Sequence, residues 1–339
     1  MKSTDLTTVE LQNNNKKVTL DDLREPVKKE LKEFRAFFRD ELKTNEFILD
    51  QLVQYLLKMK GKELRPILVL YSAKLCGEIN ERSYRAATMI ELLHTATLIH
   101  DDVVDDADER RGMFSFNKEF KNKASILFGD YLLAKGLLVS LNADEFELLK
   151  IMSKAVKAMS EGELRQLKAS KLQNMTLEKY HDIIRDKTAS LLAACCESGA
   201  RTTTDDPEVL NKMYEIGLNM GIAFQIRDDL FDYDISDTGK SQGNDIMERK
   251  ITLPFLYAVE QCSMIERSKW KKKFRKKGKT DKEVKEIVEF VKDKGGVTHS
   301  VDVMQVYSKK ALDYLGSFPE SLIKNQMELL VDYITTRKK

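Results

Sequence analysis

The chain has 339 residues, of which 42% are hydrophobic and 33% are charged, and its formal net charge is +2. This balance excludes a protein that binds nucleic acid through a general excess of cations. The four cysteines are spaced neither as zinc ligands nor as a disulfide framework, so we expect reduced thiols without a redox role.

Helix-forming residues dominate the chain and alternating β-branched runs are scarce, so we expect an all-α protein. No segment rich in Pro, Gly and Ser divides it, which favours one domain over residues 18–339 after a polar, disordered tail at 1–17. No apolar run approaches the ~18 residues that span a bilayer, and the N-terminus lacks the pattern of a signal peptide. The expected location is the cytoplasm.

The first basic signal follows the first predicted helix. A charged amphipathic pattern from Leu20 to Leu42 predicts that helix, with packing or dimer contact as its role. The run KMKGKELRP follows at 58–66, where Gly61 permits a turn. Lys62 and Arg65 then lie near the N-terminus of the next helix, where backbone N–H groups favour anions. The turn is a candidate phosphate site, and the alternative is that both side chains are only solvated.

The strongest signal lies where the apolar run MIELLHTATLIH meets the acidic run DDVVDDADERRG. Neither Gly nor Pro breaks the helix there. At about 100° per residue, Asp101, Asp102 and Asp105 are expected to face one point, where they are stable only if cations neutralise them. Mg²⁺ prefers hard oxygen ligands of this kind. Arg110 and Arg111 follow, and two arginines beside metal ligands suit a diphosphate.

The same acidic spacing recurs in FQIRDDLFDY, which contains Asp228, Asp229 and Asp232. A single acidic cluster at a helix end is more often a solvated surface or a cap than a metal site. Two such helices that face each other would instead form a cavity with carboxylates on both walls. The recurrence therefore favours a metal site over coincidence.

Further polar residues flank these clusters. Lys187 and Thr188 begin the apolar helix DKTASLL and are costly to bury without a partner such as a diphosphate or a developing charge. Gly239 and Gly243 predict a loop beside Lys240 and Lys250, and we expect these lysines to contact phosphate oxygens. Asp245 is a further carboxylate that could lie near the metal ions.

Three other segments carry weaker signals. Ser125 to Leu141 is apolar on nearly every face and predicts a core helix. Glu163 and Arg165 in EGELRQL are expected only to form ion pairs or to be solvated. The run from Lys269 to Lys279 holds eight Lys and Arg in eleven positions. It is interpreted as a solvated connection, with weak contact to anionic lipid headgroups as the alternative.

With these residues in order, the chain resembles the trans-isoprenyl diphosphate synthases. The resemblance extends from Gly61 to Pro254 and rests on GKxxRP, DDxxD followed by RRG, GDYLLA, EGE, KT, FQxxDDxxD and GK…K…TLP. It implies a single-domain helical bundle around a central cavity, with the aspartate-rich motifs on facing helices, and a homodimer. The implied reaction is the head-to-tail (1'-4) condensation of isopentenyl diphosphate onto an allylic diphosphate, with Mg²⁺ as cofactor, at three ions per active site.

The resemblance also implies roles for individual residues. Asp101, Asp105 and Asp228 would bind Mg²⁺, which stabilises the departing diphosphate, and released pyrophosphate would remove the proton. Lys187 and Lys240 would bind the allylic diphosphate, and Thr188 and Gln225 would stabilise the allylic cation. Isopentenyl diphosphate would be bound by four residues: Lys62, Arg65, His94 and Arg111.

Product length is expected to depend on the two residues that lie four and five positions before the first aspartate. Short-chain members of the family carry an aromatic residue there, ~6–7.5 Å deeper in the cavity. This chain has Thr97 and Ala96 instead, and it is most similar to long-chain, octaprenyl-type synthases that supply quinone side chains. Leu133 and Leu137 are candidates for a deeper floor. We expect Ala96→Phe or Ala96→Tyr to shorten the product.

Three alternatives stay open at this point. The first is a short-chain farnesyl or geranylgeranyl diphosphate synthase. The second is a class I terpene cyclase, although such an enzyme needs no isopentenyl diphosphate site and its second metal motif usually mixes Asn, Ser or Thr and Glu. The third is a non-catalytic synthase subunit, which would be free to lose metal ligands, whereas this chain has kept both sets.

Overall fold

The computed structural model describes residues 18–59, 61–110, 112–172, 174–233 and 243–337. The predictions about the tail at 1–17, Arg111 and Lys240 concern residues outside these ranges.

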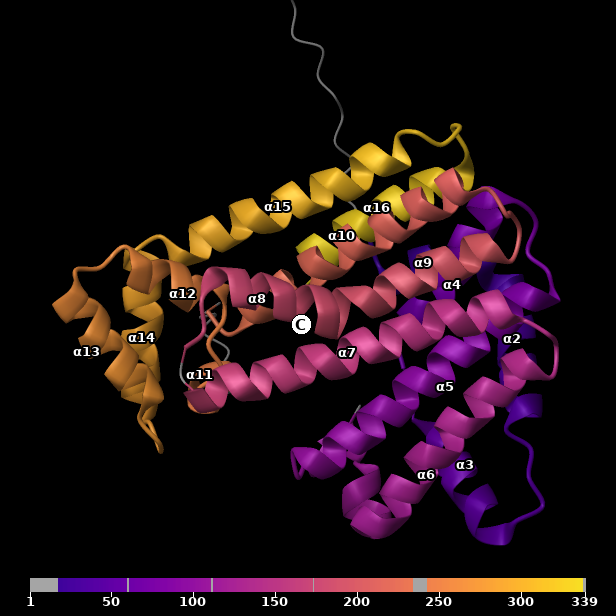
Figure 1. Ribbon diagram of the computed structural model, residues 1–339, viewed down its shortest axis with the longest axis horizontal. Helices are drawn as coiled ribbons and strands as arrows, with labels where there is room; N and C mark the ends of the chain where they lie inside the picture. The colour runs from indigo at the N-terminus through magenta and orange to yellow at the C-terminus, as the bar shows by residue number, and fades with distance from the viewer. Residues whose placement is uncertain (1–17, 60, 111, 173, 234–242, 338–339) are drawn as a thin grey trace, which may run out of the picture.

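Helices make up nearly all of the described secondary structure, which confirms the all-α prediction (Figure 1). The other element is a two-stranded antiparallel ladder, in which Arg110 of β1 (Glu109–Arg110) pairs with Met113 of β2 (Met113–Phe114). In chain order the helices are α1 (Leu20–Arg24), the 3₁₀ helix η1 (Glu25–Val27), α2 (Lys28–Glu41), α3 (Phe47–Lys58), α4 (Leu64–Cys76), α5 (Glu81–Val104), α6 (Phe116–Leu141), α7 (Phe146–Leu172), α8 (Leu177–Ile184), the π-helix η2 (Arg185–Ala189), α9 (Ser190–Arg201), α10 (Pro207–Phe231), α11 (Asn244–Met247), α12 (Leu253–Glu260), α13 (Met264–Arg275), α14 (Asp281–Asp293), α15 (Gly296–Leu315) and α16 (Leu322–Thr336).

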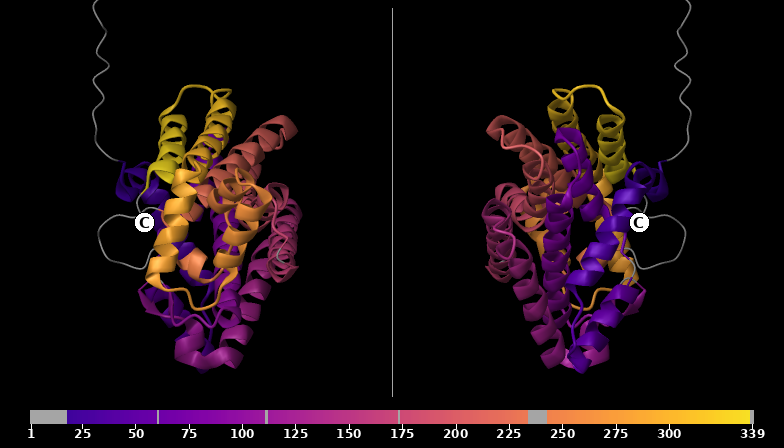
Figure 2. Two further views of the ribbon diagram at one scale, coloured as in Figure 1. Left: turned by 90° about the vertical axis from the view of Figure 1, so that its left-hand side faces the viewer. Right: turned by 90° about the vertical axis from the view of Figure 1, so that its right-hand side faces the viewer.

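The long helices run along the longest axis of the molecule, with α15 and α16 on one side and α6 on the other (Figures 1 and 2). Their apolar faces meet in one large core cluster, to which α4, α5, α7, α10 and α16 all contribute: Tyr71, Ile90, Met152, Met220 and Leu330 are examples, all at most 2% exposed. The aspartates of α5 and α10 thus lie at the ends of helices that the core holds in place.

Glycines bring α10 into direct contact with its neighbours. A Cβ atom on Gly217 would lie 2.4 Å from the carbonyl oxygen of Leu192, and one on Gly221 would lie 2.5 Å from the Cα of Ala189. Any larger residue would force α10 away from η2 and α9. The two glycines therefore set the distance between α10 and the segment that carries Lys187 and Thr188.

The first predicted helix, Leu20 to Leu42, is interrupted. Pro26 lies in the 3₁₀ turn η1, which separates α1 from α2. Proline has no N–H to donate and disfavours the helical conformation of the residue before it, so the amphipathic pattern is shared by two helices.

The prediction that Ser125–Leu141 is a core helix was wrong for one of its faces. The segment lies in α6, which buries Phe128, Leu132 and Val139, but a row of apolar side chains along it is 43–60% exposed: Ile126, Leu127, Leu137, Leu138 and Leu141. Among the described residues, α6 is also long and apolar enough to span a bilayer by length and composition alone, contrary to our expectation.

Candidate active site

The first aspartate cluster lies where α5 ends. A capping box between Asn80 and Ser83 begins this helix, which continues to Val104 with Asp105 as its C-cap. Asp101 and Asp105 are exposed, one helical turn apart, and neither carboxylate is hydrogen-bonded or ion-paired to another described side chain. This edge of α5 therefore offers two carboxylates to an external cation.

Asp102 does not join them, and the expectation that all three carboxylates face one point was wrong. Its side chain is 2% exposed and accepts hydrogen bonds from Arg110, one of them 2.9 Å from Nε. The helix turns about 100° between Asp101 and Asp102, which is enough to direct the second carboxylate toward β1. Asp102 thus fixes Arg110 beside the cluster.

The second cluster lies where α10 ends. This helix begins with Asp206 as N-cap and Pro207 in its first turn. Asp228 pairs with Arg337, which follows α16 and is 8% exposed. Asp232, the C-cap, accepts a hydrogen bond of 2.6 Å from the backbone N–H of Asp245. Cations and N–H groups of the chain itself compensate these carboxylates.

Asp229 is the centre of a buried hydrogen-bond network. Its carboxylate is 1% exposed and accepts from the hydroxyl of Tyr180 at 2.6 Å and from Nε2 of Gln225 at 2.9 Å. The Thr188 hydroxyl donates to Oε1 of Gln225 at 2.8 Å. Asp229 therefore orients Gln225, and through Gln225 also Thr188, the second member of the predicted cation-stabilising pair.

Lys187 and Thr188 lie on a π-helix between α8 and α9. A π-helix adds one residue to a helical turn and often marks a functional site. Lys187 forms an ion pair with Glu163 of α7. At Gly162, a Cβ atom would lie only 2.7 Å from the backbone nitrogen of Lys187, so α7 packs directly against this turn. Glu163 pairs, as expected from the sequence, but its partner is a predicted substrate ligand.

Lys250 brings a second lysine to the α10 side. Its Nζ lies 3.2 Å from the carboxylate of Asp245 and 3.7 Å from that of Asp229. The neighbouring acids raise the pKa of Lys250, although burial acts in the opposite direction. Lys250 therefore stays charged and holds Asp245 beside the cluster.

Burial dominates the electrostatics of the acidic residues. It raises the pKa of Asp228 and Asp229, against the lowering effects of Arg337 and Lys250, respectively. Asp101 is exposed, but the protein around it displaces enough water to raise its pKa as well, against the lowering effect of Lys187. Burial likewise raises the pKa of Asp245 to about 6, with Asp229 and Asp232 adding repulsion. The cations of the chain therefore offset the cost of burying these carboxylates only in part, and bound metal ions would offset more of it.

Two adjoining cavities lie between these elements. A narrow one of about 50 Å³ is lined by Tyr180, Lys187, Thr188, Gln225 and Asp229 among others. A wider one of about 500 Å³ shares Lys250 with it and adds further cations: Lys171, Arg249 and Arg275. Five predicted residues thus meet at one place, whereas Lys62, Arg65 and His94 line neither cavity.

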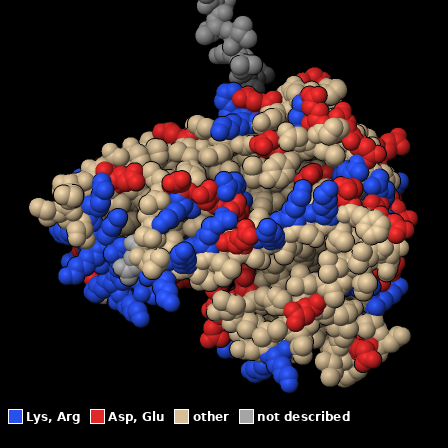
Figure 3. All heavy atoms as spheres, viewed as in Figure 1, with Lys and Arg blue, Asp and Glu red and all other residues tan. Residues whose placement is uncertain are grey.

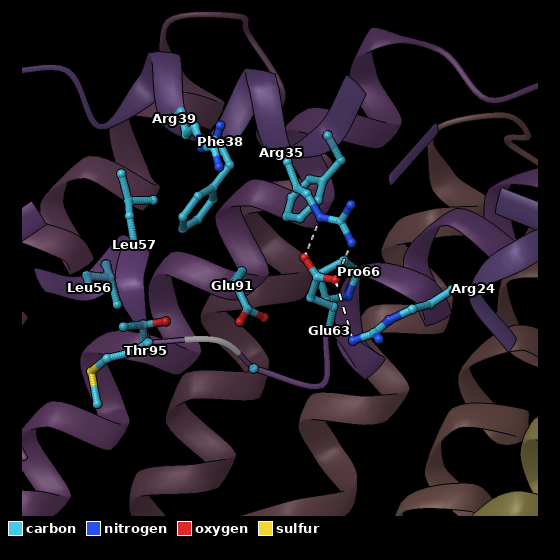
Figure 4. A pocket seen from close by; sticks show the side chains of 13 residues that line it. Arg24, Arg35, Phe38, Arg39, Leu56, Leu57, Glu63, Pro66, Glu91 and Thr95 are labelled. Carbon is cyan, nitrogen blue, oxygen red and sulfur yellow. Dashed lines mark hydrogen bonds and ion pairs between the residues drawn. The ribbon is translucent and has the colours of Figure 1, made fainter. Parts of the chain in front are cut away.

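Arginines of the preceding helices α1 and α2 contact the basic turn before α4. Glu63, its N-cap, has a left-handed backbone with φ of 57°. Arg35 donates two hydrogen bonds to its carboxylate, at 2.8 and 2.6 Å, and Arg24 lies 3.8 Å away, as Figure 4 shows. A pocket of about 370 Å³ opens beside this turn. Lys62 itself is exposed, so the turn presents its cation to solvent.

The carboxylates suit a metal that is completed by substrate oxygens. Within the described ranges, no group of three acidic, histidine or cysteine side chains is close enough to hold a metal ion alone. The unpaired Asp101 and Asp105 and the Arg337-paired Asp228 are hard ligands of the kind that Mg²⁺ takes one or two at a time. Phosphate oxygens and water would supply the remaining positions.

The comparison with known proteins assigns this arrangement to a family. The model of the family described as polyprenyl synthetase matches residues 46–291, more than two thirds of the chain. The chain belongs to the polyprenyl synthetase family. It is therefore a prenyltransferase of the polyprenyl diphosphate synthase type.

Three similar proteins show the range of this family. Octaprenyl diphosphate synthase of Escherichia coli (strain K12) is 34% identical, over 73% of this chain and 79% of its own. The crystal structure of a Caulobacter crescentus CB15 polyprenyl synthase, complexed with calcium and isoprenyl diphosphate, is 31% identical with a TM-score of 0.86, over 96% and 99% of the two chains. That of a Bacteroides thetaiotaomicron geranylgeranyl pyrophosphate synthase is 36% identical with a TM-score of 0.80, over 94% and 100%.

Sequence reasoning missed two residues at the site of this synthase and gave a third, Glu163, no role there. Arg337 reaches Asp228 from 109 positions away, and Tyr180 reaches Asp229 from 49. Glu163 was discounted, although it pairs with Lys187. No spacing rule links such distant positions. The only available signal was a Tyr and a Glu within apolar helical stretches, where a polar group needs a partner.

Proposed function

We propose that this synthase makes a long-chain, octaprenyl-like all-trans polyprenyl diphosphate for a quinone side chain. It would do so by Mg²⁺-dependent head-to-tail condensation of isopentenyl diphosphate onto an allylic diphosphate. The observation that carries the proposal is the meeting of Lys187, Thr188, Gln225, Asp229 and Lys250 around one cavity beside both aspartate clusters. Cations for a diphosphate and dipoles for a carbocation are both present there.

The allylic diphosphate would bind between the two clusters. Asp101, Asp105 and Asp228 would hold Mg²⁺, three ions in all, which supplies electrostatic stabilisation of the departing pyrophosphate. Lys187 would bind the diphosphate oxygens, and Lys240, which lies outside the described residues, would have the same role. Lys250 lines the same cavity as Lys187. Lys187 must exchange its Glu163 ion pair for the substrate, a change that a flexible lysine side chain makes easily.

The carbocation that forms would lie against neutral oxygens. The Thr188 hydroxyl and the Gln225 side-chain carbonyl already face each other at 2.8 Å, and Asp229 and Tyr180 keep Gln225 from rotating. Oriented dipoles that need no reorganisation stabilise a developing charge best. Asp229, Tyr180 and Asp102 are therefore positioning residues in this proposal, and Asp232 has the same role through Asp245.

Isopentenyl diphosphate would bind on the other side of α5. Lys62, Arg65 and Arg111 would hold its diphosphate, with His94 beside them and Arg110 near the allylic group. The exposed Lys62 lies in the turn before α4, and the buried His94 lies on α5, which packs against α4. The alkene would attack the cation, and released pyrophosphate would accept the proton.

Product length follows from the residues below Asp101. Thr97 lies one turn earlier on the same edge of α5, since four residues turn the helix by about 400°. Its side chain is half-buried and small, so it leaves room for a growing chain. Ala96 points elsewhere, since it is fully buried in the cluster that includes Phe128 and Leu132 of α6. Thr97 is thus the stronger length determinant.

A product analysis tests the proposal. The purified chain alone, with farnesyl and isopentenyl diphosphates and Mg²⁺, should yield products near eight isoprene units by mass spectrometry. Asp101→Ala and Asp228→Ala should reduce turnover by roughly 10²-fold or more, and EDTA should abolish it. Normal turnover in either variant or in EDTA would refute the metal assignment, and no turnover by the chain alone would favour a non-catalytic subunit.

A short-chain activity is the second candidate. The Bacteroides structure named as a geranylgeranyl synthase is 36% identical, which supports a product of four units. The same analysis separates the two, because a geranylgeranyl synthase would stop at four units even with isopentenyl diphosphate in excess.

We also propose a cytoplasmic homodimer. The exposed apolar row on α6, in which Leu127 is 60% exposed and Leu138 47%, would be covered by the same row of a second copy. Contiguous apolar surface of this kind is rare on monomers and common at interfaces.

A further inference from the structure

The helix pair α13–α14 projects from one end of the molecule (Figure 1). Its inner face is aromatic: Trp270 stacks on Phe290 with ring centroids 3.9 Å apart, and Phe274 is fully buried against Phe255 at 4.1 Å. Both aromatic residues of the basic run are therefore used for packing. Residues 269–275 of the run belong to α13, which the prediction of a solvated connection did not include, and residues 276–279 form the connection from α13 to α14.

The outer face of α13 has a different composition. Its exposed residues recur every three or four positions, which places them along one side of the helix: Ile265, Ser268, Lys269, Lys272 and Lys276. Two aliphatic side chains begin this face, Met264 and Ile265, which are 86% and 85% exposed. The face is therefore apolar at the N-terminal end of the helix and cationic along the rest.

The positive charge of this face is only partly compensated. Lys273 and Lys276 pair with Glu286 and Glu283 of α14. Lys269, Lys272 and Lys277 have no ion pair with any described residue. Burial first, and then the nearby cations Arg275 and Arg267, lower the pKa of Lys271. Figure 3 shows the lysines and arginines gathered at this end of the molecule.

We propose that the exposed face of α13 docks on an anionic lipid bilayer. Phosphate headgroups would meet Lys269 and Lys272 of this face and Lys277 of the turn that follows α13, while Met264 and Ile265 would enter the acyl boundary. Amphipathic surface helices bind bilayers through this combination of basic and aliphatic side chains. The inference does not depend on the length of the product.

Nucleic acid fits this face less well. Proteins that bind single strands stack bases on aromatic side chains, and both aromatics of α13 face inward. The side chains that are exposed beside the lysines are aliphatic, and these favour a hydrocarbon boundary.

Vesicle flotation with the full chain tests the proposal. Vesicles of phosphatidylcholine with about 30% phosphatidylglycerol should carry the protein at about 0.05 M salt and release it at about 0.5 M, because salt screens surface charge. Pure phosphatidylcholine should bind much less. Lys269→Glu with Lys272→Glu should weaken partitioning by at least about fivefold per residue. Met264→Ser with Ile265→Ser should also weaken it, without changing the salt dependence.

A matched control keeps the test specific. Lys32→Glu with Lys150→Glu makes the same change in net charge on exposed residues of α2 and α7, and it should leave partitioning unchanged. Each variant should keep the wild-type thermal midpoint and its turnover of soluble substrates. The proposal would be overturned if the control variant lost as much partitioning as the α13 variants, or if the protein did not bind anionic vesicles. Binding of an oligonucleotide in preference to vesicles would also overturn it.

Discussion

Arg337 neutralises a carboxylate that we assign to Mg²⁺. It pairs with Asp228, its guanidinium lies 4.2 Å from the ring centre of Phe224, and Arg227 donates to its backbone carbonyl at 2.9 Å. These contacts fix the arginine at the site. The metal and the arginine must therefore compete for the same carboxylate.

Replacement of Arg337 tests this competition. Arg337→Gln should strengthen Mg²⁺ binding to the substrate-free protein by about fivefold, as expected when an opposing ion pair worth roughly 1 kcal/mol is removed. Isothermal titration calorimetry measures the change. Arg337→Lys, which retains the charge, should bind as the wild type does. Equal affinity in all three proteins would show that the ion pair does not hinder the metal.

Asp245 makes the stability of the metal-free protein depend on pH. Its pKa is raised from 3.8 to about 6, so between these values the folded protein keeps a proton that the unfolded chain has released. The stability from this group is complete below pH 4 and is lost as pH rises through 6. As pH rises from 4 to 7 in EDTA, the free energy of unfolding of the wild type should fall by up to about 3 kcal/mol relative to that of Asp245→Asn.

Urea titrations from pH 4 to 7 measure that difference. The comparison with Asp245→Asn is necessary because Asp228 and Asp229 also have raised pKa values, and their contributions cancel between the two proteins. A difference that does not depend on pH would mean that Asp245 titrates normally.

The sequence identifies the residues that form local motifs and misses those that act from a distance. The aspartates, Lys187 and Thr188 could be found because helical spacing and neighbouring residues mark them. The inward direction of Asp102 could not, since only the partner Arg110 on β1 distinguishes it from Asp101. Arg337 and Tyr180 depend on tertiary packing.

Helix α5 carries two different roles on two edges. Leu93 packs in the large core cluster, and helical spacing places Thr97 and then Asp101 after it along one edge of α5. Ala96 packs instead in the cluster that includes Phe128 and Leu132 of α6. The sequence treats Thr97 and Ala96 alike, because it gives their distance from the first aspartate but not which neighbour each one meets.

This difference refines the chain-length prediction. Thr97→Phe should shorten the main product, as measured by mass spectrometry, while Thr97→Val should leave it unchanged. Ala96→Phe should instead lower stability by about 1–3 kcal/mol through overpacking against α6, as measured by thermal unfolding. If Thr97→Phe makes products of wild-type length, the cavity floor lies elsewhere. Leu133, which packs against both clusters, is then the next position to change.

The outer side of α6 bears on the assembly of the whole molecule. A dimer through its exposed row should have twice the mass of the chain in sedimentation velocity experiments. Leu127→Glu with Leu138→Glu should give monomers, because charges would enter the apolar interface. Val306→Glu on α15, at a site that is 53% exposed on the opposite side of the bundle, should stay dimeric. A monomeric wild type would contradict the proposed homodimer.

Composition and periodicity were sufficient for the helical class and for most helices, because amphipathic patterns report burial directly. They were insufficient for the two faces of α6, since an exposed apolar face has the same composition as a buried one. They also missed the break at Pro26, where one amphipathic pattern continues through two helices.

The glycine contacts of α10 divide the molecule into a fixed part and a variable part. At Gly217 and Gly221 the backbone of α10 lies so close to α9 and η2 that no larger residue fits there. Side chains of α5 and α6 can be replaced without altering that contact. We therefore expect product length to change through side chains of α5 and α6, while the contact between α10 and the segment that carries Lys187 and Thr188 stays the same. Redesign of the product can follow the same division.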